Sequence, residues 1–338
     1  MSLFSNIKIN NLVVPNRFFR SATYEALATR NGSATDDLIN LYRSYKKVGL
    51  IMSSCTLVDP RGRHHPTMLS LVDSDACKSF SRLSDAVHDE GSAFGVQLAH
   101  SGMFSKIQYL NGHQPETPKN MTKNDIERVI HNFGQAARAA RDSGADCVQL
   151  HCAGPFLLGS FLSHVSNDCR NDEFGSDTVE KRSEFMRQAI CEVRKNLPMN
   201  FPVLIKLNGC SQPSFINHED ILKICQIAEN AGANAIEIAV DRDPKTKLPD
   251  YSVVSRVKTN AKVPIISTGC YTVLKEMEEA VKSGRCDMIG LSRPLIRQPG
   301  IVGMFYSGKA EKATCKNCNG CLAYTSGQEN PLKCILDK

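Results

Sequence analysis

Residues 122–151, TKNDIERVIHNFGQAARAARDSGADCVQLH, combine a helix pattern and a strand pattern in one short stretch. Apolar residues recur three and four positions apart, which places one set on a single face of an amphipathic helix: Ile126, Val129, Ile130, Phe133, Ala137 and Ala140. Thr122 and Asp125 form a capping pair at its start, and Gly144 is typical of a helix end. The residues that follow, ADCVQLH, are typical of a buried parallel strand.

The same unit recurs along the chain. Eight short apolar segments each precede or follow a helix-like segment: FFRSAT, KKVGLIMSSC, EGSAFGVQLAH, SGADCVQLH, NFPVLIKLNG, AGANAIEIAV, KVPIISTGC and SGRCDMIGLSR. Eight such units without an intervening linker favour a (β/α)8 TIM barrel, which we place at residues 1–310. A doubly wound open sheet is less favoured, because no G-x-G-x-x-G follows any of these segments.

The composition is that of an ordinary globular protein. Of the 338 residues, 41% are hydrophobic and 22% are charged, which is enough apolar material for a large core. The formal net charge is +6, and Lys and Arg are scattered among Asp and Glu, so nothing indicates nucleic acid binding. The amino end lacks the apolar run of a signal peptide, and no stretch approaches the length of a membrane span. We therefore predict a soluble cytoplasmic protein.

In a TIM barrel the reacting groups come from the carboxyl ends of the strands. Here those ends carry polar or small side chains: Ala22, Thr23, Tyr24, Cys55, Gln97, His100, His151, Lys206, Asn208, Gly269, Cys270, Ser292 and Arg293. We expect these residues to gather on one rim of the barrel. Their concentration is more informative than any single member.

The last two predicted strands end in STGCYT and GLSRPL. In TIM barrels the loops after strands seven and eight often bind a phosphate through backbone N–H groups and the amino end of a short helix. Gly269 allows close approach of the backbone, and Arg293 supplies a cationic fork. Either alone could be an ordinary turn or a surface arginine, but their occurrence on adjacent strands favours a phosphate site.

Gln97 and Lys206 would complete a flavin site on the same rim. The amide of Gln97 can donate and accept hydrogen bonds at the imide edge of a flavin. Lys206 would place a positive charge where a reduced flavin gathers negative charge. Taken singly, Gln97 could be a polar group of the core and Lys206 the partner of a carboxylate. Together with a phosphate site, they indicate FMN.

The chain also resembles the Old Yellow Enzyme family, the NADH:flavin oxidoreductase and NADH oxidase group. Matching pieces keep the family order from about residue 3 to residue 300: LFSNIKINNLVVPNRFFRSATYE, GLIMSSCTLVDPRGR, GVQLAHSGM, FLSHVSNDCRNDEFG, VLIKLNG, IISTGC and MIGLSRPL. The resemblance implies FMN contacts at Ser21, Ala22, Thr23, Cys55, Gln97, Lys206, Gly269, Cys270, Ser292 and Arg293. Cys270 replaces the second glycine of the family's phosphate-binding pair, and Lys206 stands where many members carry Arg.

The substrate end departs from the family pattern. His151 matches the histidine that polarises a carbonyl or nitro oxygen, but Gly154 replaces its usual partner and Phe156 replaces the proton-donating tyrosine. In other enzymes the loss of one such donor costs about two to three orders of magnitude in rate. The candidates for a replacement donor are Tyr24, His100, Cys152 and water. Tyr24 could equally be a packed aromatic residue with a satisfied hydroxyl.

The last part of the chain, residues 311–338, is a cysteine-rich extension. The spacing of Cys315, Cys318, Cys321 and Cys334 is a metal-ligand pattern, because thiolates two residues apart can converge on one centre. The resemblance extends to larger relatives that reduce dienoyl thioesters or oxidise trimethylamine, in which a comparable cysteine cluster holds a 4Fe-4S centre, although its spacing differs by a residue. An iron–sulfur centre served by a separate electron-transfer protein, a zinc staple and a set of free thiols remain open.

Together these observations predict an FMN-dependent oxidoreductase. It would transfer a hydride from NADH or NADPH through the flavin to an electron-poor acceptor such as an activated alkene or a quinone, with His151 and Tyr24 as the catalytic residues. The altered substrate end motivates an alternative, a flavin-binding redox sensor or electron-transfer protein with little turnover. Another FMN barrel, such as a dihydroorotate or dihydrouridine enzyme, fits the motifs poorly.

Overall fold

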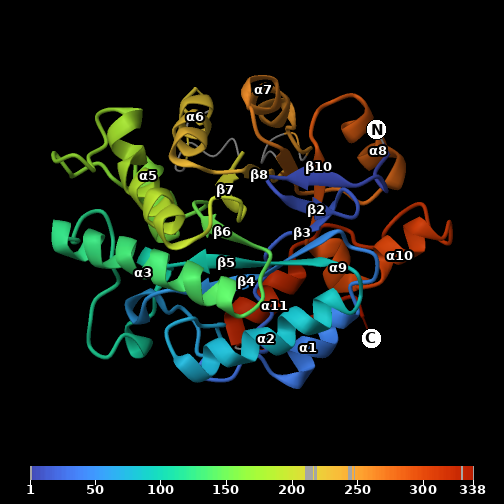
Figure 1. Cartoon of the computed structure of the whole chain (residues 1–338), viewed down its shortest axis with the longest axis horizontal. Coiled ribbons are helices and arrows are strands. Elements are labelled where there is room, and N and C mark those ends of the chain that lie inside the picture. Colours follow the sequence, from blue (N-terminus) through green and yellow to red (C-terminus); the bar gives the residue numbers. More distant parts are fainter. Residues whose placement is uncertain are drawn as a thin grey trace.

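The computed structural model describes residues 2–209, 216, 219–242, 246, 248–328 and 330–337. Within these residues, eight parallel strands form a closed barrel in the order β10-β3-β4-β5-β6-β7-β8-β9 (Figure 1). The strands are β3 (Phe18–Arg20), β4 (Leu50–Leu57), β5 (Ala93–Ala99), β6 (Cys147–His151), β7 (Val203–Asn208), β8 (Ala235–Ala239), β9 (Ile265–Thr268) and β10 (Met288–Leu291). Seven of the predicted strand segments contain one of these strands, and KKVGLIMSSC covers all but the last two residues of β4, so the predicted TIM barrel is confirmed.

Helices surround the strands and cover their outer faces (Figure 1). The longer ones are α1 (Asp36–Arg43), α2 (Ser74–His88), α3 (Lys123–Asp142), α5 (Val179–Asn196), α6 (Ile221–Ala231), α7 (Ser252–Asn260) and α8 (Leu274–Lys282), while α11 (Gly320–Gln328) belongs to the carboxyl-terminal segment. The shorter ones are α4 (Leu157–Leu162), α9 (Arg293–Arg297), α10 (Ile301–Tyr306) and the 3-10 turns η1 (Pro60–Gly62), η2 (Gly102–Phe104) and η3 (Ile107–Tyr109).

Helix α3 forms where the apolar pattern and the capping pair predict a helix. Its predicted apolar face is buried, and Thr122 and Asp125 form a reciprocal capping box in which each side chain accepts a hydrogen bond from the other residue's backbone N–H. Gly144 takes a left-handed conformation just beyond the helix, where a side chain would be strained. The chain then enters β6 directly, so the helix end fixes where that strand begins.

A small antiparallel hairpin closes the amino-terminal end of the barrel. It consists of β1 (Ile7–Ile9) and β2 (Leu12–Val14), which pair with each other but not with the barrel strands. Ile9 and Val14 are fully buried and pack with the amino-terminal residues of the barrel strands, including Phe19 and Leu50. This end of the barrel is therefore filled with apolar side chains, which leaves the opposite end for a ligand.

The carboxyl-terminal segment folds back against the barrel. Its first residues pair with the loop before α8, since the N–H of Ala313 donates to the carbonyl of Thr272 at 2.8 Å. Farther on, the N–H of Leu332 donates to the carbonyl of Glu25 at 2.8 Å, beside the carboxyl end of β3. The segment thus lies against the rim at which the predicted site residues end.

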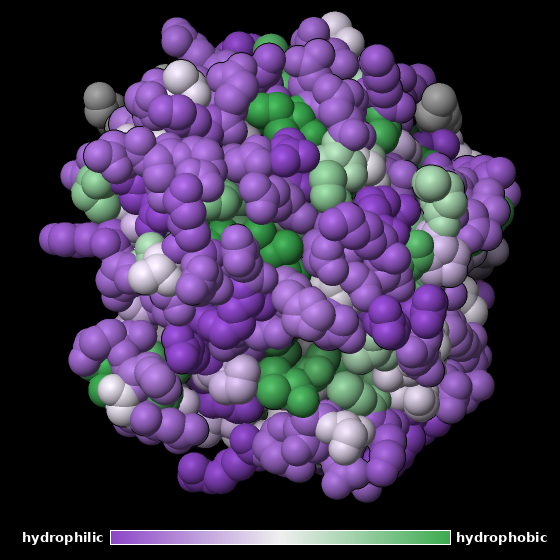
Figure 2. All heavy atoms as spheres, turned by 60° about the vertical axis from the view of Figure 1, so that its left-hand side comes forward, coloured by the Kyte–Doolittle hydropathy of each residue, from purple (hydrophilic) through white to green (hydrophobic). Residues whose placement is uncertain are grey.

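The surface carries apolar side chains only in scattered positions on the face that Figure 2 shows, where hydrophobic atoms gather in small separate areas between hydrophilic side chains. Such scattered apolar residues are normal on a folded protein. No helix among the described residues has the length and apolar character needed to cross a membrane.

Candidate functional site

A cavity of about 430 Å³ lies at the carboxyl ends of the barrel strands. Its lining includes most of the residues predicted to bind a flavin: Ser21, Ala22, Thr23, Lys206, Gly269, Cys270, Ser292 and Arg293, together with Tyr24. The volume is within the usual range of about 300–1,000 Å³ for small-molecule sites. Residues from strands distant in sequence meet here; for example, the hydroxyls of Thr23 and Ser292 are 2.8 Å apart.

Three predicted site residues lie beside this cavity rather than in its lining. Gln97 is fully buried inside the barrel on β5, and Cys55 is buried on β4. His151 ends β6 and is half-buried. Burial raises the pKa of the Cys55 thiol to about 12, so this residue offers a neutral, small side chain rather than a thiolate.

The end of the cavity formed by β9 and β10 has the turn geometry expected for an anion. Gly269 has φ 124°, and an added Cβ would lie 1.8 Å from the carbonyl oxygen of Val240, so only glycine fits. Cys270 follows with φ 63°, so it keeps the left-handed backbone even though the family glycine is lost. The guanidinium of Arg293 is at the same turn, with Nη2 3.6 Å from the Cys270 sulfur.

A chain of buried polar side chains crosses the barrel interior under the cavity. The ammonium of Lys206 donates to the hydroxyl of Ser21 at 2.8 Å and lies 3.2 Å from a carboxylate oxygen of Glu237. Gln149 joins that carboxylate to Gln97 by hydrogen bonds of 2.8 Å and 2.7 Å. Sequence reasoning missed Gln149 and Glu237, although a polar residue in the middle of an apolar strand was a signal for both.

His151 has the geometry of a neutral hydrogen-bond donor. The backbone N–H of Ala153 donates to its Nδ1 at 3.3 Å, so the ring proton belongs on Nε2. Burial, and then the nearby charge of Lys206, lower the pKa of His151 to about 3. The ring of Phe156 stacks on it with centroids 4.1 Å apart.

Tyr24 lies between the cavity and a cluster of aromatic rings. Its hydroxyl contacts Nδ1 of His65 and lies 2.8 Å from the hydroxyl of Thr67. His64 packs edge-on against Tyr24 at 5.4 Å and against Phe156 at 5.9 Å. Burial, reinforced by the charge of neighbouring His65, lowers the pKa of His64 to about 4. The two histidines, in the sequence GRHHP, were not among the predicted site residues.

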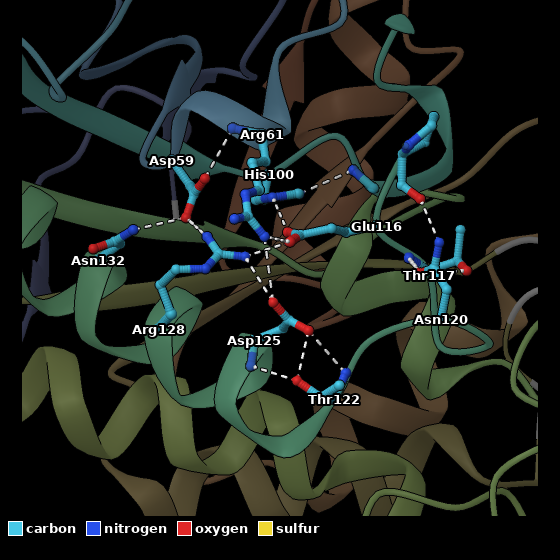
Figure 3. A network of polar contacts seen from close by, with 12 residues as sticks. Asp59, Arg61, His100, Glu116, Thr117, Asn120, Thr122, Asp125, Arg128 and Asn132 are labelled. Atoms are coloured by element: carbon cyan, nitrogen blue, oxygen red, sulfur yellow. Dashed lines mark hydrogen bonds and ion pairs between the residues drawn. The ribbon is translucent and has the colours of Figure 1, made fainter. Parts of the chain in front are cut away.

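The other two protein groups considered as replacement donors do not line the cavity. Cys152 is completely buried, and burial raises the pKa of its thiol far above the usual range. His100 is buried and lies 3.1 Å from Glu116, which also contacts Arg61 and Arg128 (Figure 3). Of the three, Tyr24 alone is in the cavity lining.

The network in Figure 3 braces the loop that carries His64 and His65. Asp59 caps η1 and is bonded by Asn132 at 2.7 Å and by Arg128, both from α3. Burial by itself raises the pKa of Glu116, but hydrogen bonds and charge from His100 and Arg128 outweigh it and lower that pKa to about 2. These ion pairs therefore tie α3 to the loop at the substrate end.

The four tail cysteines line one small hollow next to the cavity. Arg293, Asn319 and Cys321 line both spaces, and Nη1 of Arg293 donates to the side-chain oxygen of Asn319 at 2.6 Å. Among the described residues, no group of three or more His, Cys, Asp or Glu side chains is close enough to hold a metal ion. The predicted metal site is thus not confirmed.

The fold and the rim define a TIM-barrel protein with a cavity at the strand ends, where the Gly269–Cys270 turn and Arg293 suit an anionic group. A model of the NADH:flavin oxidoreductase / NADH oxidase family matches residues 2–311, and the chain belongs to that family. This confirms the family that the sequence motifs indicated.

Individual relatives are more distant. The chain is 27% identical to a metal reductase of Desulforamulus reducens, with 99% of the chain and 53% of that protein covered. It is also 27% identical to an NADPH dehydrogenase of Bacillus subtilis strain 168, with 88% of the chain and 92% of that protein covered. The chain thus spans about half the length of the first relative, and it covers 56% of an NADH oxidase of Thermoanaerobacter brockii.

Solved structures confirm the fold. A 2-naphthoyl-CoA reductase in complex with 2-naphthoyl-CoA superimposes with a TM-score of 0.89 at 22% identity, covering 98% of this chain and 56% of that one. The Old Yellow Enzyme homologue from Zymomonas mobilis gives a TM-score of 0.85 at 21% identity, covering 94% and 95%.

The lining fits FMN, the flavin that the family implies. At one end of the cavity, the backbone of the Gly269–Cys270 turn and the guanidinium of Arg293 would bind the phosphate. At the other end the side chain of Lys206 borders the space, with Gln97 connected to it through the buried polar chain. The donor set therefore suits a ligand with an anionic end and a hydrogen-bonding ring.

Proposed function

We propose that this chain is an FMN-dependent oxidoreductase that transfers a hydride from NADH or NADPH, through the flavin, to an electron-poor acceptor such as an activated alkene or a quinone. The observation that carries the proposal is the single cavity whose lining brings together Lys206, the Gly269–Cys270 turn and Arg293. Bound FMN would supply the hydride chemistry, and the protein would bind, orient and protonate.

The FMN contacts divide along the rim. Arg293, Ser292 and the backbone at Gly269 and Cys270 would hold the phosphate. Ala22 and Thr23, which follow β3, and Cys55 on β4 would face the ring system. Gln97 and Lys206 would form hydrogen bonds with its pyrimidine edge. Lys206 stands where many family members carry arginine. Lysine keeps the positive charge but lacks the bidentate hydrogen-bonding fork of a guanidinium.

His151 would anchor the acceptor. With Nδ1 occupied by the N–H of Ala153, its Nε2–H is free to donate to a carbonyl or quinone oxygen. Because burial and Lys206 lower its pKa to about 3, His151 stays a neutral donor at ordinary pH. A neutral donor polarises the oxygen without adding a full charge beside Lys206.

Tyr24 would deliver the proton that the acceptor needs after hydride transfer. It borders the cavity, and its hydroxyl is held by His65 and Thr67. An ordered phenol within reach of the reacting atom is a suitable general acid. We assign it this role because Phe156, which occupies the family's tyrosine position, has no hydroxyl.

The four tail cysteines would hold a metal centre, for which we favour 4Fe-4S over zinc. The side chains would have to close around such a centre, since no three of them among the described residues are close enough to hold an ion as they stand. A bound cluster would supply electron transfer, and the hollow that would hold it adjoins the cavity through Arg293 and Cys321. A separate electron-transfer protein would then serve as donor or acceptor. Iron and acid-labile sulfide, measured on protein purified anaerobically, test this assignment; zinc alone, or no metal, would contradict it.

The decisive experiment on function is a turnover assay. Purified protein should be yellow, NADH or NADPH should bleach the visible absorbance of the flavin, and an enone or a quinone should restore it over many cycles. If NAD(P)H bleaches the flavin but turnover is no faster than with free FMN, the result would instead favour a redox sensor or electron-transfer protein. The motivation for this alternative is that Phe156 stands where the usual acid would be. Failure to bind FMN at all would contradict both functions.

A further inference from the structure

We propose that Glu237 is the positioning residue of the flavin site, where it fixes the orientation of the Gln97 amide and offsets the charge of Lys206. The inference rests on the proposed binding of FMN. It concerns a residue in the middle of β8 that is not itself part of the cavity lining but contacts two residues that are, Ser21 and Lys206.

Glu237 is completely buried, so its carboxylate must be paired to be tolerated. Its Oε1 accepts from the hydroxyl of Ser21 at 2.6 Å and lies 3.2 Å from the ammonium of Lys206. Its Oε2 accepts from the amide of Gln149 at 2.8 Å. The carboxylate is thus the meeting point of three groups from different parts of the rim.

The carboxylate of Glu237 fixes the orientation of two glutamine side-chain amides, those of Gln149 and Gln97. A carboxylate only accepts, so Gln149 must turn its NH₂ toward Glu237 and its oxygen toward Gln97. That oxygen then accepts from the NH₂ of Gln97 at 2.7 Å. The second N–H and the oxygen of Gln97 are thereby left in a defined arrangement for the imide edge of a flavin. Without an acceptor-only group at the start, both amides could flip.

The same carboxylate sets the local charge. The Cα atoms of Lys206 and Glu237 are paired across β7 and β8, and Ser21 bridges the two by accepting from the lysine and donating to the glutamate. The pair is neutral as a unit, so the rim stabilises negative charge on a reduced flavin less than an unpaired lysine would. We therefore expect a flavin that is a stronger reductant than one beside a free cation.

Sulfite binding by the FMN-loaded full chain measures this charge effect, because the flavin–sulfite adduct is anionic. Glu237→Gln keeps the shape of the side chain and removes its negative charge, so the sulfite Kd should fall about tenfold. For the two-electron reduction of the flavin, a tenfold change in the equilibrium constant corresponds to a midpoint potential about 30 mV higher. Glu237→Asp keeps the charge and should remain within about threefold of wild type. Asp287→Asn, a largely buried carboxylate that pairs with Lys258 at the amino-terminal end of β10, is the control and should not change sulfite affinity.

Gln149→Met tests the orientation effect separately. It interrupts the relay to Gln97 without removing either charge, so the FMN Kd should rise about tenfold while sulfite affinity per bound flavin changes little. Equal sulfite affinity in wild type and Glu237→Gln, or unchanged FMN affinity in Gln149→Met, would overturn the respective half of the proposal. These outcomes are separate from the proposed function, which fails only if wild-type protein binds no FMN or shows no turnover.

Discussion

At the residue scale, the turn after β9 places two successive residues in the left-handed region, Gly269 with φ 124° and Cys270 with φ 63°. The first position has no room for a side chain, because the carbonyl of Val240 lies where a Cβ would be. The second holds a side chain at the cost that any L-residue incurs in this region. The backbone thus keeps its left-handed turn beside the cavity although the residue after Gly269 is a cysteine.

We predict that Cys270→Gly stabilises the protein by about 0.5–1 kcal/mol. Relief of left-handed strain is worth about 1–2 kcal/mol, and the greater freedom of glycine in the unfolded chain offsets part of it. Urea unfolding followed by circular dichroism measures the change. Gly269→Ala is the contrasting variant and should be strongly destabilised by its clash with Val240. A loss of stability in Cys270→Gly would show that the cysteine side chain contributes more than the strain costs.

Acid should destabilise the protein through two partly buried histidines, His64 and His151. Burial lowers the pKa of His64 to about 4 and that of His151 to about 3, below the value of about 6.5 in an unfolded chain. The unfolded state therefore binds more protons between about pH 4 and 6.5, so stability rises with pH across this window and is lost as pH falls through it.

The measurement is the free energy of unfolding at pH 7 and at pH 5. In His64→Gln the difference between the two values should be smaller than in wild type, because one group that resists protonation is gone. His131→Gln, at an exposed position on α3, is the control and should preserve the difference. An undiminished difference in His64→Gln would mean that other groups carry the acid sensitivity.

At the scale of elements, the strands and α3 could be predicted because their apolar residues recur at one period and their caps are local. The rim residues could be predicted because the barrel topology brings all strand ends together. The hairpin β1–β2 was not predicted as a plug, since its packing depends on residues far away in sequence. Glu237, Gln149, His64 and His65 were missed for the same reason, because their partners come from other elements.

The loop after β6 provides a prediction about chemistry. Gly154 has φ 64°, which asparagine tolerates, and no heavy atom lies within 4 Å of an added Cβ. Phe156 already stacks on His151, so a tyrosine there would carry its hydroxyl at the substrate end. Gly154→Asn combined with Phe156→Tyr should raise kcat/KM for an enone about ten- to a hundredfold, by restoring a donor and an acid.

Steady-state NAD(P)H consumption with 2-cyclohexenone measures that gain. Phe104→Tyr is the control, because it adds the same hydroxyl to an exposed ring that packs edge-on against Phe156, with ring centroids 5.9 Å apart. It should leave the rate near that of wild type. No gain from the double variant, in protein that still binds FMN, would indicate that the natural acceptor is not an enone.

At the scale of the whole molecule, the cysteine-rich tail and the barrel share one site. Asn319, Cys321, Leu322, Thr325 and Leu332 line the same cavity as the strand ends. The predicted division at residue 310 remains a prediction, and the backbone contacts at residues 311–313 show that this part already pairs with the loop before α8. One wall of the cavity is therefore formed by the cysteine-rich tail and not by the ends of the barrel strands.

Truncation after Ala313 should weaken FMN binding at least about tenfold while leaving the barrel folded. The cut keeps the pairing of residues 311–313 but removes the tail wall of the cavity and the Asn319 contact of Arg293. Fluorescence quenching on titration with FMN measures the Kd, and circular dichroism checks the fold. Replacement of the four tail cysteines by serine is the matched control, because it removes the thiols and retains the wall.

The pair of variants separates two roles of the tail. If the tail acts as a wall, the serine variant should bind FMN within about threefold of wild type, because Leu332 still bonds Glu25 and Asn319 still bonds Arg293. If a metal is needed to hold the tail in place, the serine variant should behave like the truncated chain, since a bound metal contributes its binding energy to local folding. Unchanged FMN affinity after truncation would show that the barrel alone forms the site.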